Sequence, residues 1–336
     1  IGIVSMIRFA ISASEALERL EKQSLWMPSI FADNAVIQRD AKLPVWGKAS
    51  VGETVVVTLD SKEDVTTADR YGEWMVTCDE ISLSDKPYTL SVRCANETLE
   101  FNNLLAGDVW LCSGQSNMEM PMKGFNAQPV QGATELILAA QPSTLIRSCN
   151  VEKVKSFDLQ EECPAKWYEN TPEGVAEASA VAYFFAKQLY DALHIPIGII
   201  HASWGGTPIE AWMSKELLET EFAGEFDLSR YETREWPEKN PNPYQYPGVL
   251  YNGMLYSLKN YTVKGFIWYQ GCNNRKKYEQ YKRLQPAFVQ MLRDEWGNQD
   301  MGFYFTQIAP YNYNDKESPA RYGGYMMWAQ AQTLEM

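Results

Sequence analysis

The first third of the chain shows the alternation of apolar and polar residues that is typical of β-strands. Residues 54–59 are almost all β-branched, residues 74–77 follow a turn signal at Tyr71-Gly72, and residues 88–92 alternate with period two. Helical periodicity is absent from this region. We therefore predict a small β-sandwich-like domain over residues 24–106, preceded by an N-terminal extension over residues 1–23.

From residue 107 onward, apolar strand-like runs alternate with helical patterns. Val181, Phe185 and Leu189, for example, recur at the four-residue spacing of an amphipathic helix. The strand-like runs cover residues 107–113, 196–200, 263–269 and 302–308, and the helical patterns cover 176–193, 209–220, 250–258 and 278–296, the last interrupted near Pro286. This alternation predicts an α/β domain over residues 107–336, with a parallel sheet covered by helices on both faces.

Composition and charge exclude several classes of function. The net charge is −13 and lysine and arginine form no cluster, which disfavours a nucleic-acid partner. The six cysteines form no C-x-x-C pair and the chain has 2 histidines, so we expect neither a zinc site nor a metal-dependent hydrolase. No run of 18 apolar residues occurs, so we expect no membrane span. An even number of cysteines leaves disulfide pairing open.

The most informative stretch is an apolar run that ends in Gly114-Gln115-Ser116-Asn117-Met118. A serine directly after a strand is exposed at the edge of a sheet, where a base can activate its hydroxyl as a nucleophile. The same position also suits a helix N-cap, so the pattern alone leaves both interpretations open. The G-x-S-x-G elbow is not present, because Met118 stands at the second position after Ser116.

Two later runs end in residues that could stabilise an oxyanion. Gly205 and Gly206 follow the run at 196–200, and a glycine pair permits either close approach of a backbone N–H or a tight turn. Gln270 follows the run at 263–269 and carries a side-chain amide that can donate, with Asn274 close behind it. Because catalytic groups collect at the carboxyl ends of parallel strands, we expect Ser116, Gly206 and Gln270 to lie together.

These three stretches resemble the motif blocks of the SGNH (GDSL-like) hydrolases, in the variant carried by sialic acid O-acetylesterases and related carbohydrate acetylesterases. The blocks are residues 114–118, 196–212 and 263–274, and the resemblance extends over about residues 27–336. It implies a flavodoxin-like parallel sheet and a serine esterase that needs no metal or other cofactor. It also implies a carbohydrate substrate and a secreted or periplasmic location.

The resemblance implies roles for individual residues. Ser116 is the nucleophile, and the oxyanion hole comprises the N–H groups of Ser116 and Gly206 together with the Gln270 amide. Gly205 and Asn274 are further candidates for the hole, and Asn117 is a candidate for substrate binding. Many relatives have Glu after Gln-Gly, where this chain has Cys272.

The general base is the missing part of this interpretation. The family carries it in an Asp-x-x-His block late in the chain, and we expect no such spacing in this sequence. His194 is expected at the end of a helix, and His201, at the end of the run leading into the glycine pair, is an alternative base. We expect the hydrolase domain to be incomplete at its C-terminus, with the histidine beyond Met336.

The sequence thus predicts a carbohydrate O-acetylesterase that removes acetyl groups from sialic acids. Two alternatives stay open. One is an esterase of the same fold that acts on acetylated xylan. The other is a carbohydrate-binding protein that has kept the fold and lost its catalytic activity.

Overall fold

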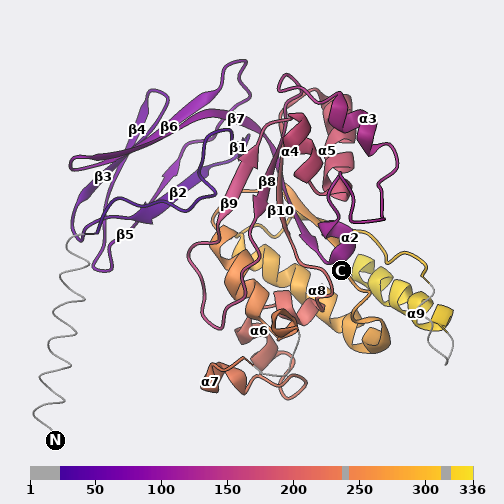
Figure 1. Ribbon diagram of the computed structural model, residues 1–336. Coiled ribbons are helices and arrows are strands. Elements are labelled where there is room, and N and C mark those ends of the chain that lie inside the picture. Colours follow the sequence, from indigo (N-terminus) through magenta and orange to yellow (C-terminus); the bar gives the residue numbers. More distant parts are fainter. Residues whose placement is uncertain (1–22, 237–241, 312–318, 336) are drawn as a thin grey trace, which may run out of the picture.

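The computed structural model describes residues 23–236, 242–311 and 319–335, and Figure 1 shows two parts joined by a long strand. The first part is built of short strands: β1 (Val36–Gln38), β2 (Leu43–Lys48), β3 (Thr54–Leu59), β4 (Lys62–Thr67), β5 (Glu73–Cys78) and β6 (Tyr88–Cys94). β2 pairs with β5, and β3 lies between β4 and β6 in a second antiparallel layer. The predicted strands at 54–59, 74–77 and 88–92 correspond to β3, β5 and β6.

The core of this first part forms because each strand buries alternate residues. Val55 and Val57 of β3 are fully buried, and they belong to one apolar cluster with Val45 of β2 and Trp74 of β5. Burial of one face from each layer is the packing of a two-layered β-structure. The predicted extension lies outside the described residues except for Gln23.

β7 (Glu97–Gly114) joins the two parts without a linker. Its first half pairs antiparallel with β6, and its second half pairs parallel with β10 (Ile197–Ser203) and β11 (Gly265–Tyr269). The predicted boundary between residues 106 and 107 therefore lies inside a single strand. Gly107 permits this continuity, because a Cβ there would collide with the backbone of Pro196.

The second part is an α/β domain, which confirms the predicted fold class. Its sheet has the order β9 (Ala165–Tyr168), β8 (Ile146–Val151), β10, β7, β11 and β12 (Gly302–Phe305). All neighbours are parallel except β9, which is antiparallel to β8. Since β10 lies between β7 and β8, the order differs in detail from the 2-1-3-4-5 of flavodoxin. As in flavodoxin, the central strand has later strands on both sides: β10 lies on one side of β7 and β11 on the other.

The helices cover both faces of the sheet (Figure 1). They are α2 (Ser116–Glu119), α3 (Ala133–Leu138), α4 (Pro172–Glu177), α5 (Ala180–Leu193), α6 (Lys215–Thr220), α7 (Arg230–Thr233), α8 (Tyr278–Glu295) and α9 (Pro319–Ala331), with short helical turns such as Ile209–Trp212 and Tyr251–Leu255. Trp110 and Cys112 of β7 belong to the apolar layer under α5, and Val109 and Leu111 belong to the layer under α8. This alternation is what a strand buried on both faces requires.

Two predicted helices differ from the observed ones. The pattern at 176–193 divides into α4 and α5, and α8 continues through Pro286 without a break. A proline inside a helix costs about 3 kcal/mol. The cost is offset because Tyr281, Leu284 and Phe288 on the same helix are fully buried against the sheet. Within the described ranges, no helix is both long and apolar enough to cross a membrane.

Candidate active site

Ser116 lies at the carboxyl edge of the sheet, where β7 gives way to α2. The turn depends on Gly114, which has φ +145° and whose Cβ would collide with the backbone of Tyr269. The Gln115 N–H donates to the Tyr269 carbonyl at 3.0 Å, which fixes the start of α2 against β11. Ser116 itself is exposed, and its hydroxyl makes no hydrogen bond within the described part of the chain. It is therefore open to a substrate.

The glycine pair after β10 lies directly beside Ser116. A Cβ placed on Gly205 would be 3.5 Å from the Cβ of Ser116 and 2.9 Å from the Oε2 atom of Glu119. Gly206 has φ +74°, which is the left-handed conformation that favours glycine. The structure thus brings together two stretches of chain that the sequence analysis predicted to meet.

Glu119 is hydrogen-bonded to one of the two glycines, Gly205. Its Oε2 atom accepts the N–H of Gly205, and its Oε1 atom pairs with the Lys153 ammonium at 2.5 Å. The Gly205 N–H is therefore already hydrogen-bonded in this structure, which favours Gly206 as the donor, and both candidate roles stay predictions. The N–H groups of Gly206 and Ser116 are donated to no acceptor among the described residues. Neither Glu119 nor Lys153 was recognised from the sequence.

Gln270 and Asn274 lie behind the site rather than in it. Gln270 is fully buried, and its amide donates to the Thr207 carbonyl at 3.0 Å and to the Oδ1 atom of Asn274 at 2.8 Å. Asn274 accepts the N–H of Ile209 and donates to Glu210 at 2.7 Å. Both hydrogens of the Gln270 amide thus have acceptors inside the protein in this structure, and its role in the oxyanion hole stays a prediction. These side chains support the loop that carries Gly206.

The front of the same loop is held by exposed and half-buried amides. The Gly206 carbonyl accepts hydrogen bonds from Gln245 and Asn273, each at 2.6 Å. Gln115 accepts the backbone N–H of Asn273 at 3.3 Å, which connects the end of β7 to the loop after β11. These two hydrogen bonds fix the peptide unit between Gly206 and Thr207, which directly follows the candidate donor. Asn117 is half-buried beside Tyr269, to which it is hydrogen-bonded.

Aromatic rings form a wall next to the glycine pair. The rings of Trp204 and Tyr244 stack with centroids 4.6 Å apart, and Lys153 lies 5.7 Å from the centre of the Trp204 ring. The Tyr244 hydroxyl oxygen would be 3.9 Å from a Cβ on Gly206. Aromatic faces and nearby polar groups are the usual elements of a site that binds a small polar molecule.

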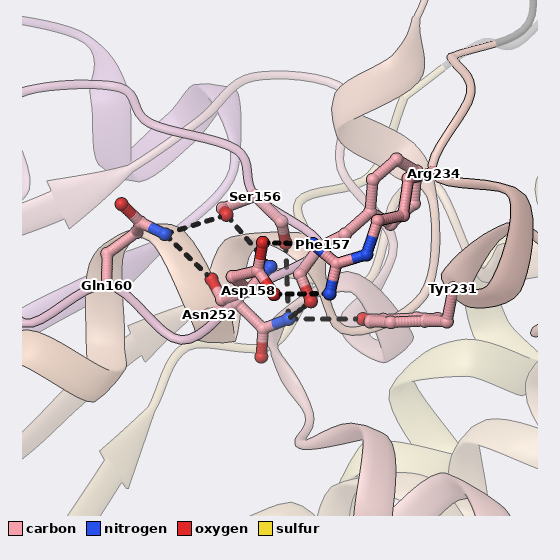
Figure 2. Close-up of polar contacts among 7 residues, drawn as sticks. All are labelled: Ser156, Phe157, Asp158, Gln160, Tyr231, Arg234 and Asn252. Carbon is pink, nitrogen blue, oxygen red and sulfur yellow. Dashed lines mark hydrogen bonds and ion pairs between the residues drawn. The ribbon is translucent and has the colours of Figure 1, made fainter. Parts of the chain in front are cut away.

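Figure 2 shows contacts between the loop joining β8 to β9 and residues that precede and follow Tyr244 in the sequence. The Asn252 amide donates to the carbonyls of Ser156 and Phe157, and Arg234 pairs with Asp158 through both of its terminal nitrogens. The Phe157 ring also packs against Tyr246, two residues after Tyr244. These contacts connect the chain on both sides of Tyr244 to the β8–β9 loop.

His201 is not positioned as the base of Ser116. Its Nε2 atom is hydrogen-bonded to Ser203 at 2.6 Å, and the ring is also hydrogen-bonded to the backbone of Met118. Burial lowers the pKa of His201 to about 4, against a smaller opposing effect of the Glu119 charge. The residue is therefore neutral at pH 7 and occupied by other partners.

Contrary to the expectation from the sequence, one Asp-x-x-His spacing does occur in the chain, at Asp191 to His194. Asp191 is paired with Lys187 at 2.6 Å, and His194 ends α5 with φ +52°. His194 precedes β10, whereas Ser116 lies beyond the other end of the parallel strands. The seven residues of β10 separate the two ends by about 20 Å. This pair is therefore not the catalytic block.

The cysteines and the acidic residues supply no further chemistry here. All six cysteines are free thiols; Cys272 is half-buried and the others are buried. Burial raises the pKa of the Cys163 thiol to about 12, so it is protonated at neutral pH. In the parts of the chain described above, no group of three or more His, Cys, Asp or Glu side chains is placed to hold a metal ion.

A parallel sheet with an exposed serine and free backbone donors at its carboxyl edge has the architecture of the SGNH-type α/β hydrolases. Residues 106–323 match the model of a family described as carbohydrate esterase, sialic acid-specific acetylesterase. The chain is 34% identical over 299 residues to a human sialate O-acetylesterase, covering 82% of this chain and 54% of the relative. It therefore belongs to the sialic acid-specific acetylesterase family of carbohydrate esterases.

Two further comparisons agree with this membership. A rat sialate O-acetylesterase is 31% identical over 316 residues, covering 80% of this chain and 57% of the relative. A crystal structure of a carbohydrate acetylesterase from Xanthomonas citri is 32% identical with a TM-score of 0.80, covering 93% of this chain and 66% of that one. The chain thus spans somewhat more than half the length of the curated relatives that it matches.

Proposed function

We propose that this chain carries the nucleophile and oxyanion donors of an esterase that removes O-acetyl groups from carbohydrates, with sialic acids as the preferred substrates. The observation that supports this most directly is the contact between exposed Ser116 and the Gly205–Gly206 turn at the carboxyl edge of the sheet. Family membership and the names of the relatives support the same reaction.

In this proposal, Ser116 attacks the carbonyl carbon of an acetyl ester. The negative charge that develops on the carbonyl oxygen is stabilised by the N–H groups of Ser116 and Gly206. A donor of this kind is worth about 2.7–4 kcal/mol in the transition state. The sugar hydroxyl leaves, and water then releases acetate from the acyl-serine.

The general base comes from the Asp-x-x-His pair that the family resemblance implies, because neither His194 nor His201 is hydrogen-bonded to Ser116. It would accept the Ser116 proton and deliver it to the leaving hydroxyl. This assignment is a proposal about the complete protein. The secreted or periplasmic location expected from the resemblance also stays a prediction.

On the substrate side, the stacked Trp204–Tyr244 pair supplies an apolar surface, and Asn117 supplies an amide. Lys153 adds a positive charge beside Trp204, which favours an anionic sugar such as sialic acid over neutral xylan. Part of this charge is compensated by Glu119.

The test compares acetate release from O-acetylated sialic acid and from acetylated xylan by the complete protein. We expect faster release from the sialic acid, and Lys153→Met should reduce this preference while retaining hydrolysis of a small neutral acetyl ester. Equal or faster release from xylan would contradict the proposed substrate. No release from any of the three esters would contradict the proposed reaction and favour a protein that only binds glycans.

A further inference from the structure

A second cleft lies where the β-domain meets the α/β domain. It has a volume of about 320 Å³, within the range of small-molecule sites. Trp26, Trp46 and Trp74 line one side of it, and the segment from Tyr256 to Asn260 lines the other. None of the candidate active-site residues contributes to its lining. It is therefore separate from the esterase site.

The local backbone is arranged so that three indoles converge here. Trp46 lies in β2 and Trp74 in β5, while Trp26 pairs with Lys48 through two backbone hydrogen bonds of 2.9 Å. Gly47 makes this close packing possible, because a Cβ there would collide with the Trp26 backbone and lie 2.8 Å from the Trp74 ring. Trp26 and Trp46 are half-buried, so part of each ring is accessible.

The cleft also presents polar groups without partners. Within the described residues, the side chains of Glu73 and Asn260 make no hydrogen bond. A carboxylate accepts hydrogen bonds from hydroxyl groups, and an amide both donates and accepts them. Aromatic faces with such groups beside them match the two surfaces of a pyranose ring, one of C–H groups and one of hydroxyls.

The charges of the cleft select against an anion. Lys48 pairs with Glu161, and the Lys259 ammonium lies 4.0 Å from the centre of the Tyr256 ring and 3.9 Å from Glu295. The positive charge of each lysine is thus already balanced by a carboxylate of the protein. The lining also contains Asp69 and Glu73, so the balance around a ligand is negative.

From these observations we infer that the cleft is a second glycan-binding site, specific for neutral pyranose units. It would hold a neutral part of a glycan independently of the esterase site. The inference concerns binding alone and does not depend on the proposed function.

The test is a titration with neutral sugars, in which binding is measured by calorimetry and by tryptophan fluorescence. The probes are lactose, maltotriose, cellotriose, xylotriose and mannotriose, with N-acetylneuraminic acid as the anionic comparison. We expect at least one neutral sugar to bind with Kd below about 10 mM. Trp26→Ala and Trp46→Ala should each weaken binding about tenfold, which corresponds to 1.4 kcal/mol.

Trp328→Ala is the matched control, because Trp328 is 43% exposed but lies on α9, outside the cleft. It should leave binding unchanged. Asn260→Ala, which removes no buried ring, should weaken binding several-fold and keeps the test decisive if a tryptophan variant fails to fold. The inference is overturned if no neutral sugar binds at that concentration. It is also overturned if binding is unaffected by the cleft variants, or if N-acetylneuraminic acid binds there equally well.

Discussion

Replacing Glu119 should slow catalysis although Glu119 does not touch the reacting atoms. Its carboxylate holds the Gly205 N–H on one oxygen and Lys153 on the other. A hydrogen bond to a charged group contributes about 1.5–3 kcal/mol. Without it, the Gly205 N–H loses its acceptor, and the turn that carries Gly206 loses a contact that holds it against α2. The loss cannot exceed that of one oxyanion donor, which is about 10²- to 10³-fold in kcat.

We therefore expect Glu119→Ala to lower kcat for acetate release about 10- to 100-fold, with little change in KM. Glu119→Gln keeps an oxygen that can accept the Gly205 N–H, so it should lose less than about tenfold. Lys153→Met is the control that removes the half-exposed ion pair and leaves the Gly205 hydrogen bond in place. For a pair of this exposure, the contribution is about 0.2–1 kcal/mol.

The assay is steady-state acetate release by the complete protein from a small neutral acetyl ester, with thermal unfolding measured for each variant. Wild-type kcat in Glu119→Ala would refute the argument. So would equal losses in Glu119→Ala and Lys153→Met, because the ion pair rather than the glycine turn would then be the important contact.

Three other outcomes are expected. Gly206→Ala should lower kcat more than Gly205→Ala, because Gly206 has φ +74°, where any other residue is strained, and carries the proposed oxyanion donor, whereas a Cβ on Gly205 would closely approach only the flexible Glu119 side chain; the reverse order in steady-state assays would contradict the site geometry. The pKa of His201 is about 4 in the folded protein and 6.5 in the unfolded chain, so between these pH values only the unfolded chain binds the proton. The free energy of unfolding should therefore fall by up to about 3 kcal/mol as the pH drops from 6.5 to 4. Denaturant unfolding of His201→Gln should show a flatter pH dependence, and an unchanged one would exclude this cause. His194→Ala should leave kcat unchanged, and a large loss would show that the Asp191–His194 spacing is catalytic after all.

The location of the candidate active site could be predicted from the sequence, because that location depends on where the strands end. The apolar runs before Ser116, Gly206 and Gln270 are short and uninterrupted, and the carboxyl ends of parallel strands meet at one edge. The α/β class followed from the same pattern. Gly107 shows where the pattern misleads, because a glycine that suggests a new element instead permits β7 to pass close to Pro196.

The roles of the donors could not be predicted, because they depend on contacts between distant parts of the chain. The Gly205 N–H is hydrogen-bonded to a carboxylate 86 positions earlier, and no local sequence pattern predicts that contact. Gln270 has the right chemistry for a donor, but its partners are set by the loop after β10, which folds over it. Pro286 is a similar case in the fold. Its local preference against a helix interior is outweighed by the burial of neighbouring side chains in α8.

Substitution of Ser116 tests the central claim most directly. Acetate release from O-acetylated sialic acid by the complete protein should fall more than about 10³-fold in Ser116→Ala. Ser113→Ala is the matched control, because Ser113 is buried three residues earlier with no hydrogen-bond partner for its hydroxyl in the described structure. It should retain wild-type activity. Retained activity in Ser116→Ala would show that another group is the nucleophile and would contradict the account.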